Sequence, residues 1–163
     1  MATNVKPIPD GYHALTPHIT VNGAERAIDF YQKAFGAKVS PVMKTPDGRV
    51  MHAEVRIGDS VLMLNDPFPE HGGSRAATGD PGPITIHLYV DRVDDVFQKA
   101  VKNGAAEKMP LMDMFWGDRY GQVVDPFGIR WSLATHIKDV SPQEMEQAQK
   151  EMAKQMEQQR KTA

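Results

Sequence analysis

The sequence predicts an α+β protein in which two tandem βαβββ modules form a cupped mixed sheet, with a helix at the C-terminus. The main observation is an internal repeat. Residues 18–37, HITVNGAERAIDFYQKAFGA, have the pattern of a short strand, a turn, a helix and a glycine stop. Residues 87–105, HLYVDRVDDVFQKAVKNGA, show the same pattern 69 positions later (87 minus 18). A repeat that keeps its register over half a chain indicates a duplicated supersecondary unit.

The second observation is that the apolar positions of the two predicted helices coincide at this offset. Both sets follow the i, i+3, i+4, i+7 spacing of a helix with one buried face. They are Ala24, Ala27, Ile28, Tyr31 and Phe35 in the first copy, and Val93, Val96, Phe97, Ala100 and Gly104 in the second. Each helix therefore covers one face of its sheet, and the other face is free to line a cavity.

The first copy follows an extended arm at residues 1–12. We expect the first module at residues 13–66, with Gly36 as the helix C-cap and with hairpin turns at Asp47-Gly48 and Gly58-Asp59. Its predicted strands are residues 15–21, 38–45, 50–57 and 60–65, and its predicted helix is residues 24–35. In the first strand, Leu15, Ile19 and Val21 are expected to point toward the helix, because side chains alternate along a strand.

A Gly- and Pro-rich linker at residues 67–83 separates the two copies. The second module is predicted at residues 84–137, with strands at 84–90, 107–115, 119–125 and 129–135 and a helix at 93–102. A tail at residues 138–163 begins its helix with Ser141 as N-cap and Glu144 completing a capping box. Its apolar stripe predicts a helix lying on its own domain or on a sister subunit: Met145, Ala148, Met152 and Met156.

Composition excludes several classes of function. The chain is 40% hydrophobic and 25% charged, as is ordinary for a soluble globular protein. A net charge of −2 gives no electrostatic reason to expect nucleic acid or an anionic membrane as partner. No apolar run approaches the ~20 residues of a membrane span, and no secretory signal core is present, so we expect a cytoplasmic protein. The absence of cysteine excludes disulfides and thiolate chemistry.

Hairpin register predicts which side chains share the cavity side of each sheet. With a two-residue turn at Gly58-Asp59, Glu54 faces Met63 across the strands. The cavity side of the first module then carries Thr16, His18, Thr20, His52, Glu54, Arg56 and Met63. That of the second module carries Thr85, His87, Tyr89, Arg130 and Ser132. A carboxylate between imidazoles and a guanidinium is suited to a general base or to orienting a polar ligand. A partly solvated ladder of charged residues is the alternative interpretation.

Two phrases carry a resemblance to a known family. AIDFYQKAFGA follows the first strand, and DPFG precedes the last; residues 52–66 and 113–136 add to the pattern. Over residues 12–137 the chain resembles the glyoxalase/bleomycin-resistance/extradiol-dioxygenase superfamily, also called vicinal oxygen chelate, and within it the PhnB-like branch. The resemblance implies a homodimer, because the cupped sheets are often completed by a sister chain. It does not specify an activity, since one scaffold hosts unrelated functions.

The resemblance also implies where a metal would be held. Metal-dependent members place ligands on the first and last strand of each half, and these positions correspond here to Thr16, Met63, Thr85 and Ser132. None is a usual ligand of a divalent metal, so we expect neither the inherited metal centre nor another cofactor. His18 and His87 lie two residues further along their strands, which leaves open a shifted metal site completed by Glu54.

Three functions stay open from the sequence. The first is a metal-free protein that binds a small organic molecule, as drug-sequestering relatives do. The predicted ligand-binding residues are His18, His52, Glu54, Met63, His87, Tyr89, Trp116 and Ser132, with further apolar contact from Met43. The second is a metal-dependent lyase, isomerase or dioxygenase that uses His18, His87 and Glu54, with Glu54 the candidate catalytic residue. The third is a domain that only assembles, with its C-terminal helix as the docking element.

Overall fold

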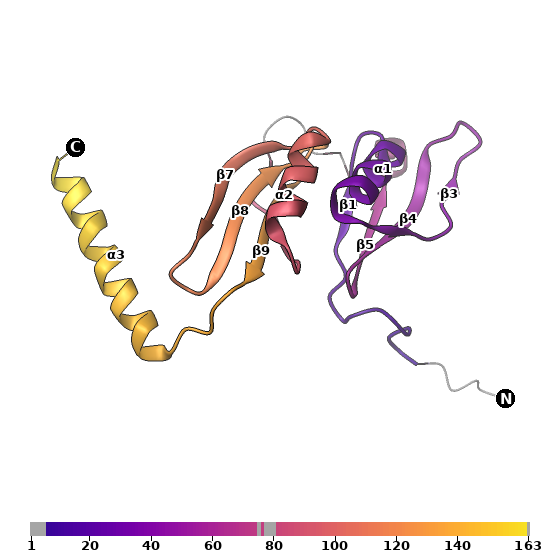
Figure 1. The fold of residues 1–163 in the computed structure, drawn as a ribbon. Helices are drawn as coiled ribbons and strands as arrows, with labels where there is room; N and C mark the ends of the chain where they lie inside the picture. Colours follow the sequence, from indigo (N-terminus) through magenta and orange to yellow (C-terminus); the bar gives the residue numbers. More distant parts are fainter. Residues whose placement is uncertain (1–5, 75, 77–80, 163) are drawn as a thin grey trace.

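The computed structural model describes residues 6–74, 76 and 81–162 (Figure 1). Parts of the predicted arm and linker, residues 1–5, 75 and 77–80, therefore lie outside the described residues. The predicted class is confirmed: two βαβββ modules, each with a mixed sheet, are followed by a C-terminal helix. Each module has a sheet of its own.

The elements follow the predicted order. Module 1 contains β1 (His18–Thr20), α1 (Ala24–Phe35), β2 (Lys38–Val39), β3 (Met43–Lys44), β4 (Val50–Ile57) and β5 (Ser60–Asn65). A short 3-10 helix, η1 (Pro69–His71), follows it. Module 2 contains β6 (Thr85–Tyr89), α2 (Val93–Lys102), β7 (Ala106–Asp113), β8 (Asp118–Val124) and β9 (Arg130–His136). The tail forms α3 (Pro142–Thr162). Both module helices have the bounds that the apolar period predicted.

Strand pairing repeats with the sequence. The strand order is β1-β5-β4-β2 in module 1, with β3 also paired to β4, and β6-β9-β8-β7 in module 2. The first strand of each module runs parallel to its last strand. His18 pairs with Met63 and His87 pairs with Ser132, which is the same register 69 positions apart. The predicted pairing of Glu54 with Met63 is confirmed.

The first strand is shorter than predicted, and its early residues do not face the helix. Leu15 is 86% exposed, and the hydroxyl of Thr16 donates to the carbonyl of His13 at 3.0 Å. Pro17 has no N–H to give to a ladder, although its carbonyl accepts from the amide of Met63. Regular pairing therefore starts at His18. The predicted strand 38–45 is likewise interrupted, and β2 and β3 flank Ser40-Pro41-Val42.

The two modules meet through their helix sides. Figure 1 shows α1 and α2 side by side in the middle of the molecule, with one sheet on either side. The fully buried Tyr31 packs against Trp131, with ring centroids 5.5 Å apart, and its hydroxyl donates to Asp125 at 2.9 Å. The sheet faces that carry no helix therefore point outward, away from each other.

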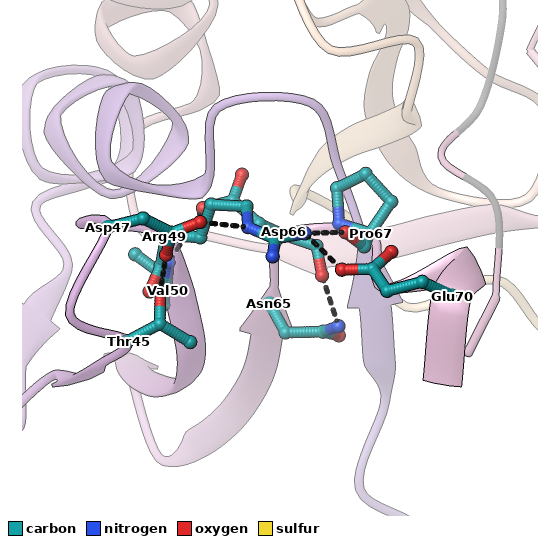
Figure 2. Close-up of polar contacts among 8 residues, drawn as sticks. All are labelled: Thr45, Asp47, Arg49, Val50, Asn65, Asp66, Pro67 and Glu70. Atoms are coloured by element: carbon teal, nitrogen blue, oxygen red, sulfur yellow. Dashed lines mark hydrogen bonds and ion pairs between the residues drawn. The ribbon is translucent and has the colours of Figure 1, made fainter. Parts of the chain in front are cut away.

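A residue at or just after the end of the last strand of each module caps the helix of that module. Asp66 accepts the backbone N–H groups of Gly23 and Ala24, both at 2.9 Å, at the start of α1. Its other carboxylate oxygen accepts the N–H of Val50 at 2.8 Å (Figure 2). Thr135, 69 positions later, accepts the N–H of Val93 at the start of α2 at 2.9 Å. Both helices thus begin where a neighbouring strand supplies the missing acceptor.

The tail helix stands apart from both sheets in Figure 1. Its predicted capping box is confirmed: the Glu144 carboxylate accepts the N–H of Ser141 at 2.8 Å, and the Ser141 hydroxyl accepts the N–H of Glu144 at 3.3 Å. Met152 in the predicted apolar stripe is 36% exposed, and the side chain of Met156 lies outside the described residues. The helix therefore does not lie on its own domain, and docking on a sister subunit stays a prediction. No helix in the described part of the chain is long and apolar enough to cross a membrane.

Candidate functional site

The outward face of module 1 gathers four of the predicted site residues. We call it the module 1 face: His18, His52, Glu54 and Met63, joined by Tyr12 and Asn65. The Glu54 carboxylate accepts from the Tyr12 hydroxyl at 2.5 Å and lies 3.1 Å from Nε2 of His52. His18 lies 2.9 Å from the side-chain oxygen of Asn65, and its ring is edge-on to that of His52 at 6.1 Å. The face therefore presents one carboxylate held from two sides.

The contacts of Glu54 determine its charge. Hydrogen bonds from Tyr12 first, and from His52 second, hold the pKa of the Glu54 carboxyl below its ordinary value. The same bond raises the pKa of Tyr12. Arg56, which the sequence placed in a charged ladder with Glu54, instead donates to the backbone carbonyls of Asp59 and Gly11, both at 3.1 Å. Glu54 is therefore a stable anion held by neutral donors and an imidazole.

The outward face of module 2 is aromatic. We call it the module 2 face: His87, Tyr89, Trp116 and Ser132 from the prediction, joined by Tyr120 and Gln122. Nδ1 of His87 lies 2.7 Å from the Ser132 hydroxyl. The His87 ring is edge-on to Tyr89 at 4.5 Å and stacked on Tyr120 at 6.1 Å. Burial lowers the pKa of His87, and Asp118 opposes this only in part, so the imidazole is neutral at pH 7.

A buried carboxylate positions two of these rings. Asp118 is 3% exposed and accepts from the Tyr89 hydroxyl at 2.9 Å and from the Trp116 indole N–H at 3.0 Å. Nδ1 of His136 lies 2.8 Å from its other oxygen. Burial alone would raise the pKa of Asp118, but the bonds from His136, Tyr89 and Trp116 bring it below the ordinary value. The bond from Tyr89 also raises the pKa of the Tyr89 phenol.

The structure divides the predicted site into two separate sets. His18 contacts Asn65 and His52 on one face, whereas His87 contacts Ser132, Tyr89 and Tyr120 on the other. In the described ranges, no group of three or more His, Asp or Glu residues is placed to hold a metal ion. The shifted site of His18, His87 and Glu54 is therefore not assembled within one chain.

The four positions that the family resemblance marks for metal ligands do not form such a site either. Met63 lies beside His18 in the sheet, and the Ser132 hydroxyl is bonded to His87. Thr85 is on β6, and Thr16 bonds to the arm before β1. Hydroxyl and thioether groups are poor ligands for the divalent metals that prefer carboxylate and imidazole. These residues do not fit the metal centre of the family.

Six residues that form or hold the two faces were not among the predicted site residues. They are Tyr12, Asn65, Asp118, Tyr120, Gln122 and His136. Tyr120 and Gln122 alternate on the predicted strand 119–125, so the period of two could have found them. Tyr12 lay in the arm, and Asp118 and His136 lay at strand ends. Nothing in a local pattern indicates that these side chains return to the sheet.

Comparison with known proteins places the chain in a family. The model of the glyoxalase/bleomycin resistance protein/dioxygenase superfamily matches residues 12–133. An uncharacterized protein of Mycobacterium bovis is 44% identical over 151 residues, covering 91% of this chain and 95% of its own.

Solved structures agree with this match at the level of the fold. The protein PA1353 of Pseudomonas aeruginosa superposes with a TM-score of 0.64 at 22% identity, covering 76% of this chain and 98% of its own. The PhnB protein of Bacillus cereus superposes with a TM-score of 0.61 at 22% identity, covering 76% and 99%.

Proposed function

The chain belongs to the glyoxalase/bleomycin resistance protein/dioxygenase superfamily, and from this premise we propose that it binds a small organic molecule on its module faces. We place it in the PhnB-like branch and propose that it works without the metal centre of the family. The likeness to the PhnB protein of Bacillus cereus and the unsuitable donors at the four family positions support this proposal.

The observation that carries the proposal is the arrangement around His87. Ligand sites combine apolar and aromatic walls with a few fixed polar groups. Here Ser132 fixes the imidazole through Nδ1, and Tyr89 and Tyr120 flank its ring. In the part of the chain that the structure describes, Nε2 of His87 has no hydrogen-bond partner. A neutral imidazole with one free nitrogen can bond to a ligand as donor or as acceptor.

We further propose that a second copy of the chain completes the site. The module faces are open: Tyr89 is 59% exposed, and so is Met43, which pairs with His52 in the sheet. Large exposed apolar groups of this kind mark interaction surfaces. Pairing the module 1 face of one chain with the module 2 face of another brings the Glu54 carboxylate opposite the aromatic face. A ligand between them is then held from both sides.

The alternative is a metal-dependent lyase, isomerase or dioxygenase that uses His18, His87 and Glu54. Two observations disfavour it. A general base works best when its pKa lies near the operating pH, whereas the pKa of Glu54 is held low. His18 and His87 also lie on different faces of one chain, where they contact Asn65 and Ser132 and not each other.

A thermal-shift screen of small metabolites and divalent metals tests the proposal, because a ligand of the native state raises the melting temperature. We expect organic compounds to raise it, and His87→Gln to remove the shift. His71→Gln on η1 is the matched control and should leave the shift intact. The metal alternative requires the opposite pattern: a metal-dependent shift in protein purified without a tag, lost in the His18→Ala/His87→Ala double variant.

The dimer is tested by the mass in solution. We expect a dimer for the full chain, and a monomer for Tyr89→Glu, which places a charge in the proposed interface. Deletion of residues 141–163 should leave the dimer intact. Loss of the dimer on that deletion would instead favour α3 as the docking element.

A further inference from the structure

The interface between the modules has two ends that the internal repeat makes equivalent. At one end, the β8–β9 turn at residues 125–128 packs beside α1, where Phe127 contacts Phe30 at 6.3 Å. At the other end, the β4–β5 turn at Gly58-Asp59 lies beside β6 and α2. The residues at the two ends correspond position by position at the offset of 69, so their packing can be compared directly.

The first end is filled by aromatic rings. Tyr31 stacks on Phe35 at 5.9 Å, and Trp131 packs against Phe35 at 4.7 Å. Phe30 packs against both Tyr31 and Phe35. The five rings are Phe30, Tyr31, Phe35, Phe127 and Trp131, and all except Phe127 are buried. The hollows found at this end are smaller than the cleft described below: one of about 190 Å³ lies between Ile19 of β1 and Ile86 of β6, and one of about 270 Å³ lies beside Phe127.

At the second end, the equivalent positions carry smaller or polar residues. In the order of the five rings above, they are Lys99, Ala100, Gly104, Gly58 and Leu62. None of these five residues is aromatic, and two of them, Gly58 and Leu62, line a hollow. Protein interiors are close-packed, so the absence of rings at these two positions leaves space. A cleft of about 470 Å³ lies there between the arm, the β4–β5 turn and β6. A second hollow of about 330 Å³ continues toward α2, and the two share Ile57, Gly58, Leu88 and Tyr89.

The lining of this cleft has the composition of a ligand site. Its walls are aliphatic, from Ile57, Leu62, Ile86 and Leu88, and Trp131 forms part of them. Phe35 lines the adjoining hollow, so the ring stack of the filled end reaches the empty end. The polar groups stand at one side: His13, Thr16, Asp59, Ser60 and His87. The volume lies within the roughly 300–1,000 Å³ of small-molecule pockets.

We propose that this cleft, called here the seam cleft, binds an uncharged planar aromatic molecule of about two fused rings with one hydrogen-bonding group. Side-chain rings fill the equivalent space at the other end of the interface, so a ligand ring supplies the same contacts here. Ile57, Leu62, Ile86 and Leu88 hold the rings, and the polar side near His13 and His87 binds the hydrogen-bonding group. This site extends outside the module faces, because its aliphatic walls come from residues of β4, β5 and β6 that face the core.

The test uses the full chain and the neutral naphthalene probe 6-propionyl-2-dimethylaminonaphthalene, whose emission shifts to the blue in apolar surroundings. We expect saturable binding at one probe per chain. Leu88→Phe places a ring in the seam cleft and should weaken binding by at least about tenfold. Ile19→Phe is the matched control, because Ile19 is the repeat equivalent of Leu88 and lines the small hollow at the filled end. It should change binding by less than about twofold.

A second variant keeps the test decisive if Leu88→Phe does not fold. Ser60 lies at the exposed mouth of the seam cleft. Ser60→Trp should therefore also weaken binding of the probe by about tenfold. The proposal is overturned if the probe binds Leu88→Phe or Ser60→Trp as tightly as the parent chain. It is also overturned if Tyr120→Leu on the module 2 face abolishes probe binding while folded Leu88→Phe retains it. His87 lines the seam cleft as well as the module 2 face, whereas Tyr120 does not line the seam cleft. Loss of the metabolite shift in Tyr120→Leu, with the probe still bound, therefore tests the module faces separately, so the two proposals can fail independently.

Discussion

Each module has the same turn before the strand that pairs with its last strand. The residue that closes this turn contacts the chain at or just after the end of the last strand, but its charge has opposite sign in the two modules. In module 1 the amide of Thr45 donates to the carbonyl of Arg49 at 2.9 Å, and Gly48 donates to Thr45. In module 2 the amide of Met114 donates to the carbonyl of Asp118 at 2.7 Å, and Gly117 donates to Met114. These pairs correspond at the offset of 69. The residue that closes the turn is a cation in one module and an anion in the other.

Arg49 contacts the segment after β5 at the protein surface. Figure 2 shows its guanidinium reaching Glu70 of η1, at 2.6 Å, and the carbonyl of Pro67, and Asp47 holds it at 3.0 Å. The guanidinium also lies 4.4 Å from the centre of the Phe68 ring. The Arg49 side chain is 40% exposed, so water screens each of these contacts.

Asp118 holds the end of β9 from inside, through His136, the last residue of that strand. It accepts from Tyr89, Trp116 and His136, and its side chain is only 4% exposed. His136 continues the chain of contacts to Asp139, with Nε2 3.0 Å from the carboxylate. Asp139 is the repeat equivalent of Glu70, and His136 that of Pro67. The residue that makes these contacts has the same position in both modules, whereas its charge and its burial differ.

The largest expected effect is that of Asp118→Ala. The substitution leaves the partly buried Trp116 indole N–H and the Tyr89 hydroxyl without their acceptor, so we expect a loss of about 2–3 kcal/mol in the free energy of unfolding. Urea denaturation measures it. Asp118→Asn keeps the shape and one acceptor oxygen and should lose less. An equal loss in the two variants would show that the carboxylate charge, and not the number of acceptors, holds this turn.

The two helix caps come next. Asp66→Ala removes the acceptor of three backbone N–H groups and should cost about 2 kcal/mol. Thr135→Ala removes the acceptor of one such group and should cost about 1 kcal/mol. Denaturant unfolding of both variants measures the difference. The comparison fails if Thr135→Ala costs as much as Asp66→Ala, and Asp66→Asn and Thr135→Ser are the matched controls.

Arg49→Ala should have a smaller effect than Asp118→Ala, although the two positions are equivalent. Exposed ion pairs contribute at most about 1 kcal/mol, and those of Arg49 are surface contacts. The effect should shrink further in high salt, because salt screens exposed charges. Melting temperatures at low and high salt check this. A loss as large as that of Asp118→Ala, unchanged by salt, would show that the Phe68 contact outweighs the ion pairs.

The smallest expected effect is the pH dependence of the His136 contacts in module 2. The carboxylates of Asp139 first, and Asp118 second, raise the pKa of His136 above its ordinary 6.5. A raised folded-state pKa means that the stabilisation is complete below 6.5 and is lost as the pH rises through the folded-state value. An NMR titration of the His136 ring should give a midpoint above 6.5, and Asp139→Asn should lower it.

Hydrogen exchange measures the effect of this titration on the chain after β9. When the pH rises above the pKa of His136, the backbone amides of Ile137 and Lys138, which donate to Gly117, should exchange faster than the intrinsic pH dependence explains. Unchanged protection of these amides across the transition would argue against this coupling.

Much of this molecule follows from local pattern. The apolar period placed both helices at their observed bounds, and the glycine turn at Gly58-Asp59 set the pairing of Glu54 with Met63. The repeat offset predicted that both modules share one register, because duplicated sequences with the same apolar pattern bury the same faces. The family resemblance added the expectation that the metal positions would lack metal ligands.

Tertiary structure alone decided which faces meet. Helix-side packing of Tyr31 and Trp131 turns the two sheet faces outward, so the predicted site residues fall into two separate sets. Asp66, Asp118 and Tyr12 act through partners that are distant in sequence or placed by a turn, and no periodic pattern records such partners. The sequence alone determined the repeating unit, because strand and helix periods are local. How two such units fit together depends on the shapes of side chains from both, which only the folded chain brings into contact.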